Sequence, residues 1–245
     1  MNMEKTYRIA DRNIKICSIY PDVHDLCHEY LFDGCPDFEV VTTEEDISYE
    51  HDKSIQIDAM EGKTRNHNRG YLETLAIYRK IADKMIDYDT FLFHGSAVCA
   101  DNEAYIFTAK SGTGKSTHAK LWRKMLGDKA VMVNDDKPLI RIMRDKALVY
   151  GTPYDGKHHL SNNIAVSVKG VCILEQAAEN NIKEISIYEA YPMFMQQTYK
   201  PSEPERMKKT MELIGQFLDR IKVYKLKCNM NIDAAEIAYK AMKGD

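Results

Sequence analysis

The residues best suited to chemistry in this sequence lie between positions 109 and 117, in the run Ala-Lys-Ser-Gly-Thr-Gly-Lys-Ser-Thr. This run fits the pattern of a phosphate-binding loop, with Ala109 in the first glycine position. The two glycines let backbone N–H groups turn inward, and Lys115 supplies a positive charge for the outer phosphates. The Ser116 hydroxyl is suited to Mg²⁺. The run therefore predicts a site for ATP with Mg²⁺ or Mn²⁺, formed by Ser111, Gly112, Thr113, Gly114, Lys115, Ser116 and Thr117.

An acidic pair follows the loop at a distance that suits a metal site. The apolar segment 130–133 predicts a buried strand that ends at Asn134-Asp135-Asp136. A carboxylate at the end of such a strand, beside a phosphate loop, is typical of a residue that positions a metal. Because successive strand residues point to opposite sides, we assign Asp135 to the metal with Ser116 and Asp136 to the acceptor as general base. The reverse assignment stays open.

A polar loop at 151–159, Gly-Thr-Pro-Tyr-Asp-Gly-Lys-His-His, gathers three cationic or donor side chains in a short span. We predict that this loop closes over the acceptor and that Lys157 contacts the transferred phosphoryl group. Tyr154 is predicted to border the acceptor pocket. A loop that only connects two strands is the alternative.

Hydrophobic periodicity predicts the elements that carry these residues. Strands are expected at 91–99, 105–109, 130–133, 139–142, 147–150, 171–175, 182–187 and 223–228, and helices at 71–87 and 117–126. Ser202 to Glu205 reads as a capping box that opens a further helix, and Asp233 as the cap of the last one. Before residue 71 we expect small strands, including 14–16, 38–41 and 55–59. The predicted organisation is a β-rich N-terminal lobe with a bridging helix at 1–88 and a nucleotide-binding domain at 89–245.

Composition excludes several classes of partner. The 245 residues carry a formal charge of -3 and are 44% apolar, so neither a broad basic surface for nucleic acid nor a long apolar run for a membrane is present. The N-terminus lacks the apolar core of a signal peptide, and the six cysteines form no CxxC pair. We therefore expect a cytoplasmic protein with reduced cysteines, and the formation of a homo-oligomer stays open.

Three blocks in this order resemble the HPr kinase/phosphorylase and phosphoenolpyruvate carboxykinase superfamily: His94-Gly-Ser-Ala-Val98, the SGTGKST loop and Asn134-Asp135-Asp136. The resemblance implies an α/β fold with a mixed sheet and a P-loop core. It also implies that His94, Lys115, Ser116 and the two aspartates bind nucleotide and divalent metal or handle the transferred proton. His94 is therefore predicted to contact metal or phosphate, although a histidine in an apolar strand is also a common core residue. Thr117 stands where HPr kinases usually carry Glu, which argues against HPr as the substrate.

The function predicted from these residues is an ATP-dependent kinase that phosphorylates a serine-like hydroxyl of a small molecule, peptide or protein. Lys115, His94, Asp136 and Lys157 are the predicted catalytic residues, and Ser116, Asp135 and His94 the predicted metal ligands. Two alternatives stay open. One is a nucleotide-binding regulatory module without turnover, and the other is a carboxykinase-like or phosphorolytic activity.

Overall fold

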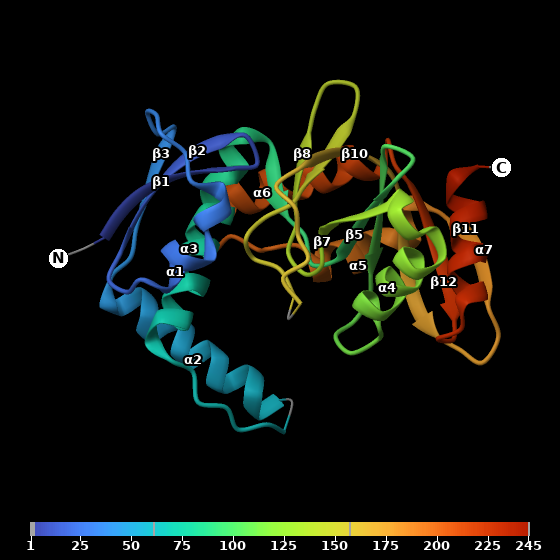
Figure 1. Ribbon diagram of the computed structural model, residues 1–245, viewed down its shortest axis with the longest axis horizontal. Helices are drawn as coiled ribbons and strands as arrows, with labels where there is room; N and C mark the ends of the chain where they lie inside the picture. Colours follow the sequence, from blue (N-terminus) through green and yellow to red (C-terminus); the bar gives the residue numbers. More distant parts are fainter. Residues whose placement is uncertain (1–2, 61, 157, 245) are drawn as a thin grey trace. The chain divides into compact units, whose positions relative to one another are not determined.

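The computed structural model describes residues 3–60, 62–156 and 158–244 (Figure 1). The chain divides into two compact units, residues 1–84 and 85–245.

The first unit combines a small sheet with three helices. Its strands are β1 (Met3–Ile9), β2 (Arg12–Ser18) and β3 (Phe38–Val41); β2 pairs with β1 antiparallel and with β3 parallel. Its helices are α1 (Asp22–Leu26), α2 (Glu44–Met60) and α3 (Arg69–Met85), with a short 3-10 turn, η1, at His28–Tyr30. The predicted helix at 71–87 is thus confirmed with small changes at its ends.

The strand predicted at 55–59 is wrong, because these residues belong to α2. Ile55 and Ile57, whose alternation suggested a strand, are 49% and 46% exposed. The face that α2 buries is mostly polar: Glu50 and Asp58 are buried, and each carboxylate is paired, Glu50 with Arg79 and Asp58 with Arg65 and His67. A buried face of charged pairs carries no helical apolar period, so the pattern was misleading. The unit is therefore mixed rather than β-rich.

The second unit is built on a nine-stranded mixed sheet. The strands run in the order β4-β8-β9-β10-β6-β5-β7, and β12 pairs with both β10 and β11. Residues 165–167 of the long strand β10 pair antiparallel with β9, and residues 170–176 pair parallel with β12. Because β10 also pairs parallel with β6, it connects all three of these strands. The strands are β4 (Thr90–Leu92), β5 (Ser96–Ala100), β6 (Glu103–Thr108), β7 (Ala130–Asn134), β8 (Leu139–Ile142), β9 (Ala147–Tyr150), β10 (Ala165–Gln176), β11 (Asn181–Ile185) and β12 (Lys222–Cys228).

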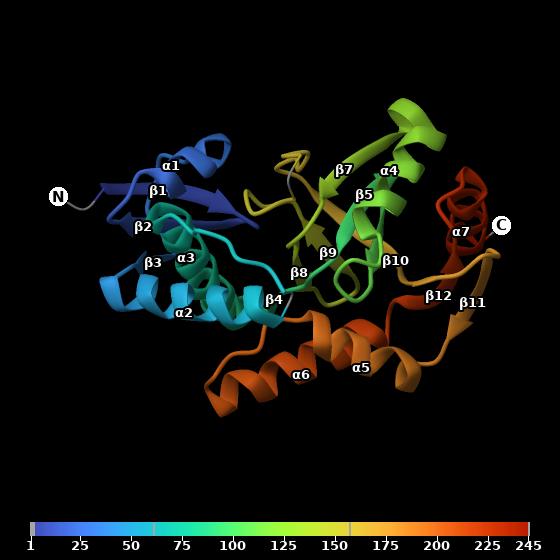
Figure 2. The ribbon, with the colours of Figure 1, turned by 90° about the horizontal axis from the view of Figure 1, so that it is seen from below.

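Helices cover both faces of this sheet. The helices are α4 (Lys115–Leu126), α5 (Ile187–Gln197), α6 (Pro204–Leu218) and α7 (Ile232–Lys243), with 3-10 turns η2 at Ile86–Tyr88 and η3 at Gly127–Lys129. α5 and α6 lie together beside the strands in Figure 2, while α4 and α7 contact each other. The second unit thus has a mixed α/β architecture.

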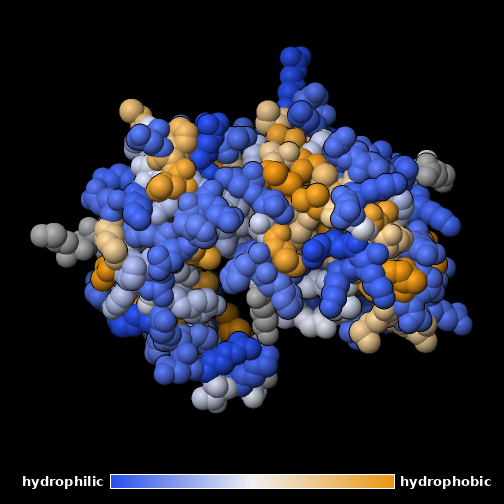
Figure 3. All heavy atoms as spheres, in the orientation of Figure 1, coloured by the Kyte–Doolittle hydropathy of each residue, from blue (hydrophilic) through white to orange (hydrophobic). Residues whose placement is uncertain are grey.

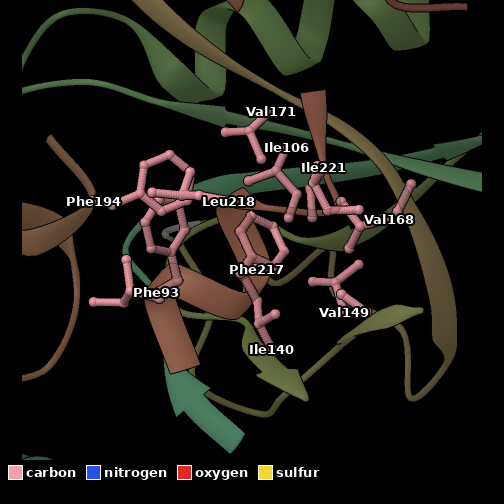
Figure 4. Packing of buried hydrophobic residues seen from close by; sticks show 14 of the residues in the cluster. Phe93, Ile106, Ile140, Val149, Val168, Val171, Phe194, Phe217, Leu218 and Ile221 are labelled. Carbon is pink, nitrogen blue, oxygen red and sulfur yellow. The ribbon is translucent and has the colours of Figure 1, made fainter. Parts of the chain in front are cut away.

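Strand alternation explains why two cores form. In β6, Ala104 and Ile106 join the core shared with α5 and α6, whereas Tyr105 and Phe107 join the core shared with α4 and α7. The residues of β10 divide in the same way. Figure 4 shows the first core, in which Phe194 and Phe217 of the helices pack against strand residues such as Ile106 and Ile140. Continuous apolar strands are expected where both faces of a sheet are covered.

The single strand predicted at 91–99 is two strands. β4 pairs with β8, whereas β5 pairs with β6 and β7. The chain leaves the sheet between them, where the His94 N–H donates to Gln197 O and the Gly95 N–H donates to Asp136 O. A Cβ on Gly95 would lie 2.9 Å from Phe107 O, so glycine permits this close approach. His94 therefore lies in a connection rather than in a strand.

Three helix starts also differ from the prediction. The capping box lies at Ser186 and Glu189, where it opens α5, a helix that periodicity did not predict. The one predicted at Ser202–Glu205 is absent: α6 starts at Pro204, and its N-cap residue Glu203 makes no side-chain cap. Asp233 lies inside α7, whose N-cap residue is Asn231. Proline fits the first helical position well, which moves the start of α6 beyond Ser202.

The loop helix and most other predicted strands occur close to their predicted ranges, and the 139–150 hairpin forms as expected. Two strands differ: β1 has no predicted counterpart, and β10 begins at Ala165, well before the predicted range 171–175. On the face drawn in Figure 3, hydrophilic side chains predominate and apolar patches lie between them. In the described part of the chain, every helix is too short or too polar to cross a bilayer.

Candidate functional site

The glycine-rich segment predicted to bind phosphate forms the turn between β6 and α4. Gly112 and Gly114 have φ angles of 77° and 113°, in the region that favours glycine. Gly114 is the N-cap residue of α4 and offers no side-chain cap, so the first N–H groups of the helix are not occupied by a capping side chain. The Gln176 side chain donates to Thr113 O at 3.2 Å and ties the turn to the end of β10.

Lys115 lies at this turn close to both aspartates. Its Nζ donates to Ala109 O at 3.2 Å. Burial lowers the pKa of Lys115, and the negative charges of Asp136 and Asp135 act in the opposite direction. The structure thus brings together the predicted loop lysine and both members of the predicted acidic pair.

Asp135 is buried, with 7% of its surface exposed, and lies beside Ser116. The Ser96 hydroxyl donates to its Oδ1 at 2.8 Å, and the Ser116 hydroxyl also hydrogen bonds to it. Burial raises the pKa of Asp135, and these two hydrogen bonds oppose the rise. This carboxylate faces the loop hydroxyl that was predicted to share a metal with it.

Asp136 has different partners. His94 Nε2 lies 3.2 Å from its Oδ1, and Lys137 Nζ lies 3.6 Å from its Oδ2. Burial by itself raises the pKa of Asp136, but the hydrogen bond from His94 and the charges of Lys137, His94 and Lys115 outweigh burial and lower it. His94 thus contacts the predicted base, Asp136, rather than Ser116 or Asp135.

Asn134 holds this arrangement together, and the sequence did not reveal its role. Its Oδ1 accepts the backbone N–H groups of Asp136 at 2.9 Å and Lys137 at 2.7 Å. Its Nδ2 donates to the hydroxyl of Thr152 at 3.0 Å, so it also anchors the start of the 151–159 loop. Ser96 was missed in the same way. The sequence offered one signal for each residue: Asn134 directly precedes the acidic pair, and Ser96 follows His94 by two residues.

The 151–159 loop packs against Asp135. A Cβ on Gly156 would lie 3.1 Å from Asp135 Oδ2, so the loop backbone passes very close to this carboxylate. Asp155 fixes the loop by accepting from His159 Nδ1 at 2.9 Å and from the Ser161 N–H at 3.1 Å. Tyr154, predicted to border the acceptor pocket, is only 6% exposed. Lys157 lies outside the described residues.

The donor set fits a small, hard cation in the presence of a nucleotide. The Ser116 hydroxyl and the Asp135 carboxylate are oxygen ligands of the kind that Mg²⁺ prefers. Among residues 3–60, 62–156 and 158–244, no group of three or more His, Cys, Asp and Glu side chains is gathered to hold a metal alone. Mg²⁺ in such sites is usually completed by phosphate oxygens and water.

Neither a family model nor a curated protein matches this chain. Among solved structures, the chain is similar to the HPr(Ser) kinase/phosphatase from Coxiella burnetii, with a TM-score of 0.33 and 10% sequence identity. The match covers 62% of this chain and 99% of that protein. A likeness at this level does not establish a shared fold or activity.

Proposed function

We propose that this protein is an ATP-dependent kinase that transfers a phosphoryl group to the hydroxyl of an acceptor. The observation that carries the proposal is the pair of adjacent carboxylates beside the 109–116 turn, each with its own partners. Asp135 hydrogen bonds to the Ser116 hydroxyl, whereas Asp136 contacts His94. A nucleotide-binding module without turnover has no need of a second carboxylate that faces an acceptor.

In the proposed ground state the turn and the N-terminus of α4 bind the phosphates of ATP, and Lys115 contacts the outer ones. Ser116 and Asp135 would hold Mg²⁺ or Mn²⁺, which when bound neutralises charge on the phosphates. The positive charges and backbone dipoles act where negative charge develops during transfer.

During transfer, the acceptor oxygen forms a bond to the γ-phosphorus while the bond from that phosphorus to the ADP oxygen breaks. The proton of the acceptor hydroxyl passes to the carboxylate of Asp136. The pKa of Asp136 is lowered, so its carboxylate is ionised at neutral pH, which is the protonation state that a general base requires. The hydrogen bond with His94 fixes its orientation.

The experiment is to incubate purified protein with ATP and Mg²⁺ and to measure ADP release with and without a panel of hydroxyl-bearing metabolites and serine peptides. Asp136→Asn should bind ATP like the parent and lose turnover by about 10² to 10⁴ fold. Asp128→Asn, which changes an exposed carboxylate in η3, is the matched control.

Lys115→Ala should weaken ATP binding strongly in calorimetry, whereas Lys129→Ala, an exposed lysine of η3, should not. Equal ATP affinity of Lys115→Ala and the parent would exclude the 109–116 turn as the nucleotide site. ATP binding without ADP release for any acceptor would instead support a module without turnover.

A further inference from the structure

A pocket of about 520 Å³ opens beside Ser116 and Asp135. Residues of α4, of the β7 end and of the 151–161 segment line it: Ser116, Thr117, Ala119, Lys120, Arg123, Met132, Asp135, His158 and Leu160. The volume is in the range of sites for small molecules. The candidate metal ligands thus form one edge of a pocket, and a second set of side chains forms the rest.

Positive charge dominates that second set. Lys120 and Arg123 project from successive turns of α4, and neither side chain makes a hydrogen bond or ion pair among the residues that the structure describes. Like charges three residues apart on a helix repel each other, and half-burying an Arg without a partner costs free energy. His158 adds a third side chain that is able to donate hydrogen bonds. An anion bound between these groups offsets both costs.

The nucleoside part of ATP has other space available. Two further pockets border residues 110–114 together with the C-terminal end of β10, and one of them includes the apolar side chains Leu121, Leu174 and Met230. The pocket with Lys120 and Arg123 instead includes Asp135, and the loop bearing His158 passes against this carboxylate. Its Ser116–Asp135 edge borders the proposed metal site, so a molecule bound in this pocket would lie next to the outer phosphates of the proposed nucleotide.

We propose that this pocket binds an anionic group, a carboxylate or a phosphate, on the small hydroxyl-bearing acceptor, and that Lys120 and Arg123 are its counter-charges. Met132, Leu160 and Ala119 contact the short carbon skeleton between the anionic group and the hydroxyl. Arg is suited to such groups because its guanidinium presents two parallel N–H donors. The inference rests on the proposed function and specifies its substrate class.

The test separates binding from turnover. Glycerate and glycerol 3-phosphate serve as the carboxylate and phosphate probes, and glycerol is the neutral control. Each is titrated by calorimetry into full-length protein whose nucleotide site is filled with ADP and Mg²⁺. We expect the parent to bind at least one anionic probe and not glycerol. Lys120→Gln and Arg123→Gln should each weaken that binding tenfold or more while leaving ATP affinity unchanged. Lys124→Gln, on the same helix but outside the pocket, should bind like the parent.

Turnover provides the second readout. With acceptors supplied as matched anionic and neutral pairs, the Lys120 and Arg123 variants should raise KM for the anionic member and leave kcat almost unchanged. Binding of neither anionic probe, or equal effects of the Lys124 variant, would overturn the inference. ADP release that ignores acceptor charge would overturn it while leaving the kinase proposal intact. Probe binding that depends on Lys120 and Arg123 without any ADP release would reject the kinase proposal and retain the anion site.

Discussion

Asp135 and Asp136 are adjacent in the sequence, yet their pKa values shift in opposite directions. Burial dominates at Asp135 and raises its pKa, whereas contacts with His94 and nearby cations dominate at Asp136 and lower its pKa. Two carboxylates whose environments separate their pKa values are suited to different tasks. The proposed metal role of Asp135 and proton-accepting role of Asp136 rest on their contacts, Ser116 for the first and His94 for the second, rather than on these pKa directions.

Ser96→Ala should raise the Mg²⁺ concentration that supports half-maximal ADP release by about tenfold to hundredfold, because outer partners of metal ligands typically have effects of this size. The Ser96 hydroxyl lowers the pKa of Asp135, so its removal raises that pKa further. A metal ligand must be deprotonated, and the defect should therefore be larger at pH 6 than at pH 8. Thr210→Val removes a hydroxyl in α6 that bonds within the helix and is the control. A pH-independent defect would contradict this role.

His94→Ala should move the acidic limb of the kcat/KM profile to higher pH. Burial acts to raise the pKa of Asp136, and the hydrogen bond from His94 is the largest effect that lowers it, so removing His94 should raise that pKa. The base then becomes protonated, and activity is lost, at a higher pH than in the parent. His94→Gln retains an N–H donor and should stay closer to the parent profile. An unshifted profile together with a higher Mg²⁺ requirement would show that His94 acts as a metal ligand instead.

At the scale of elements, the site depends on how the 151–159 loop leaves β9. Gly151 has no space for a side chain, because a Cβ there would lie 1.8 Å from Asn162 O and 2.6 Å from Val133 O. Both neighbours are backbone atoms, so they cannot move aside as a flexible side chain does. Asn134 then fixes Thr152, and the loop continues to Gly156 beside Asp135.

Gly151→Ala should destabilise the second unit by roughly 1–3 kcal/mol, since the added methyl group forces the backbone to shift. Gly215→Ala should stabilise it by about 0.5–1 kcal/mol, because Gly215 lies within α6 with nothing within 4 Å of its Cβ position. Urea unfolding monitored by Trp122, the single tryptophan of the chain, reports on this unit. Equal stability of Gly151→Ala and the parent would show that the loop tolerates a side chain at this position.

At the scale of the whole molecule, the two units imply that unfolding can involve more than one transition. Trp122 lies in the core between the sheet, α4 and α7, and its Nε1 donates to His118 Nε2 at 3.1 Å. His118 is buried beneath the candidate site, and burial lowers its pKa from 6.5 to about 4. The fluorescent probe therefore contacts a titratable group that must stay neutral in the folded unit.

The stability of the second unit should fall as pH decreases from 6.5 toward 4. In this window the unfolded chain binds a proton on His118 that the folded unit excludes, so acid favours unfolding by up to about 1.4 kcal/mol per pH unit. Above pH 6.5 the imidazole is neutral in both states and this contribution is complete. His118→Gln keeps an acceptor for Trp122 and should make the same unfolding transition less dependent on pH. An equally steep dependence in that variant would assign the acid sensitivity to other groups.

The sequence by itself determined the features that depend on local order. The 109–117 run predicted a glycine-rich turn between a strand and a helix, and the structure has that turn with φ values of 77° and 113° at the two glycines. Apolar runs such as 105–109 predicted buried strands, and in the structure alternation sends neighbouring side chains of this run to opposite faces of the sheet. Such features are encoded in neighbouring residues. The contact of Lys157 with the transferred phosphoryl group stays a prediction from the sequence, since this residue lies outside the described ones.

Only the tertiary structure decided which of the chemical residues meet. His94 and Asp136 come together because the chain leaves the sheet after β4, and Ser96 reaches Asp135 from a position 39 residues away. The helical state of α2 likewise depends on partners such as Arg79, which lies on another helix. The pocket with Lys120 and Arg123 combines a helix, a strand end and a loop. Neither hydrophobic periodicity nor a short motif predicts these contacts. The free energy that stabilises them comes from interactions between segments that are distant in the sequence.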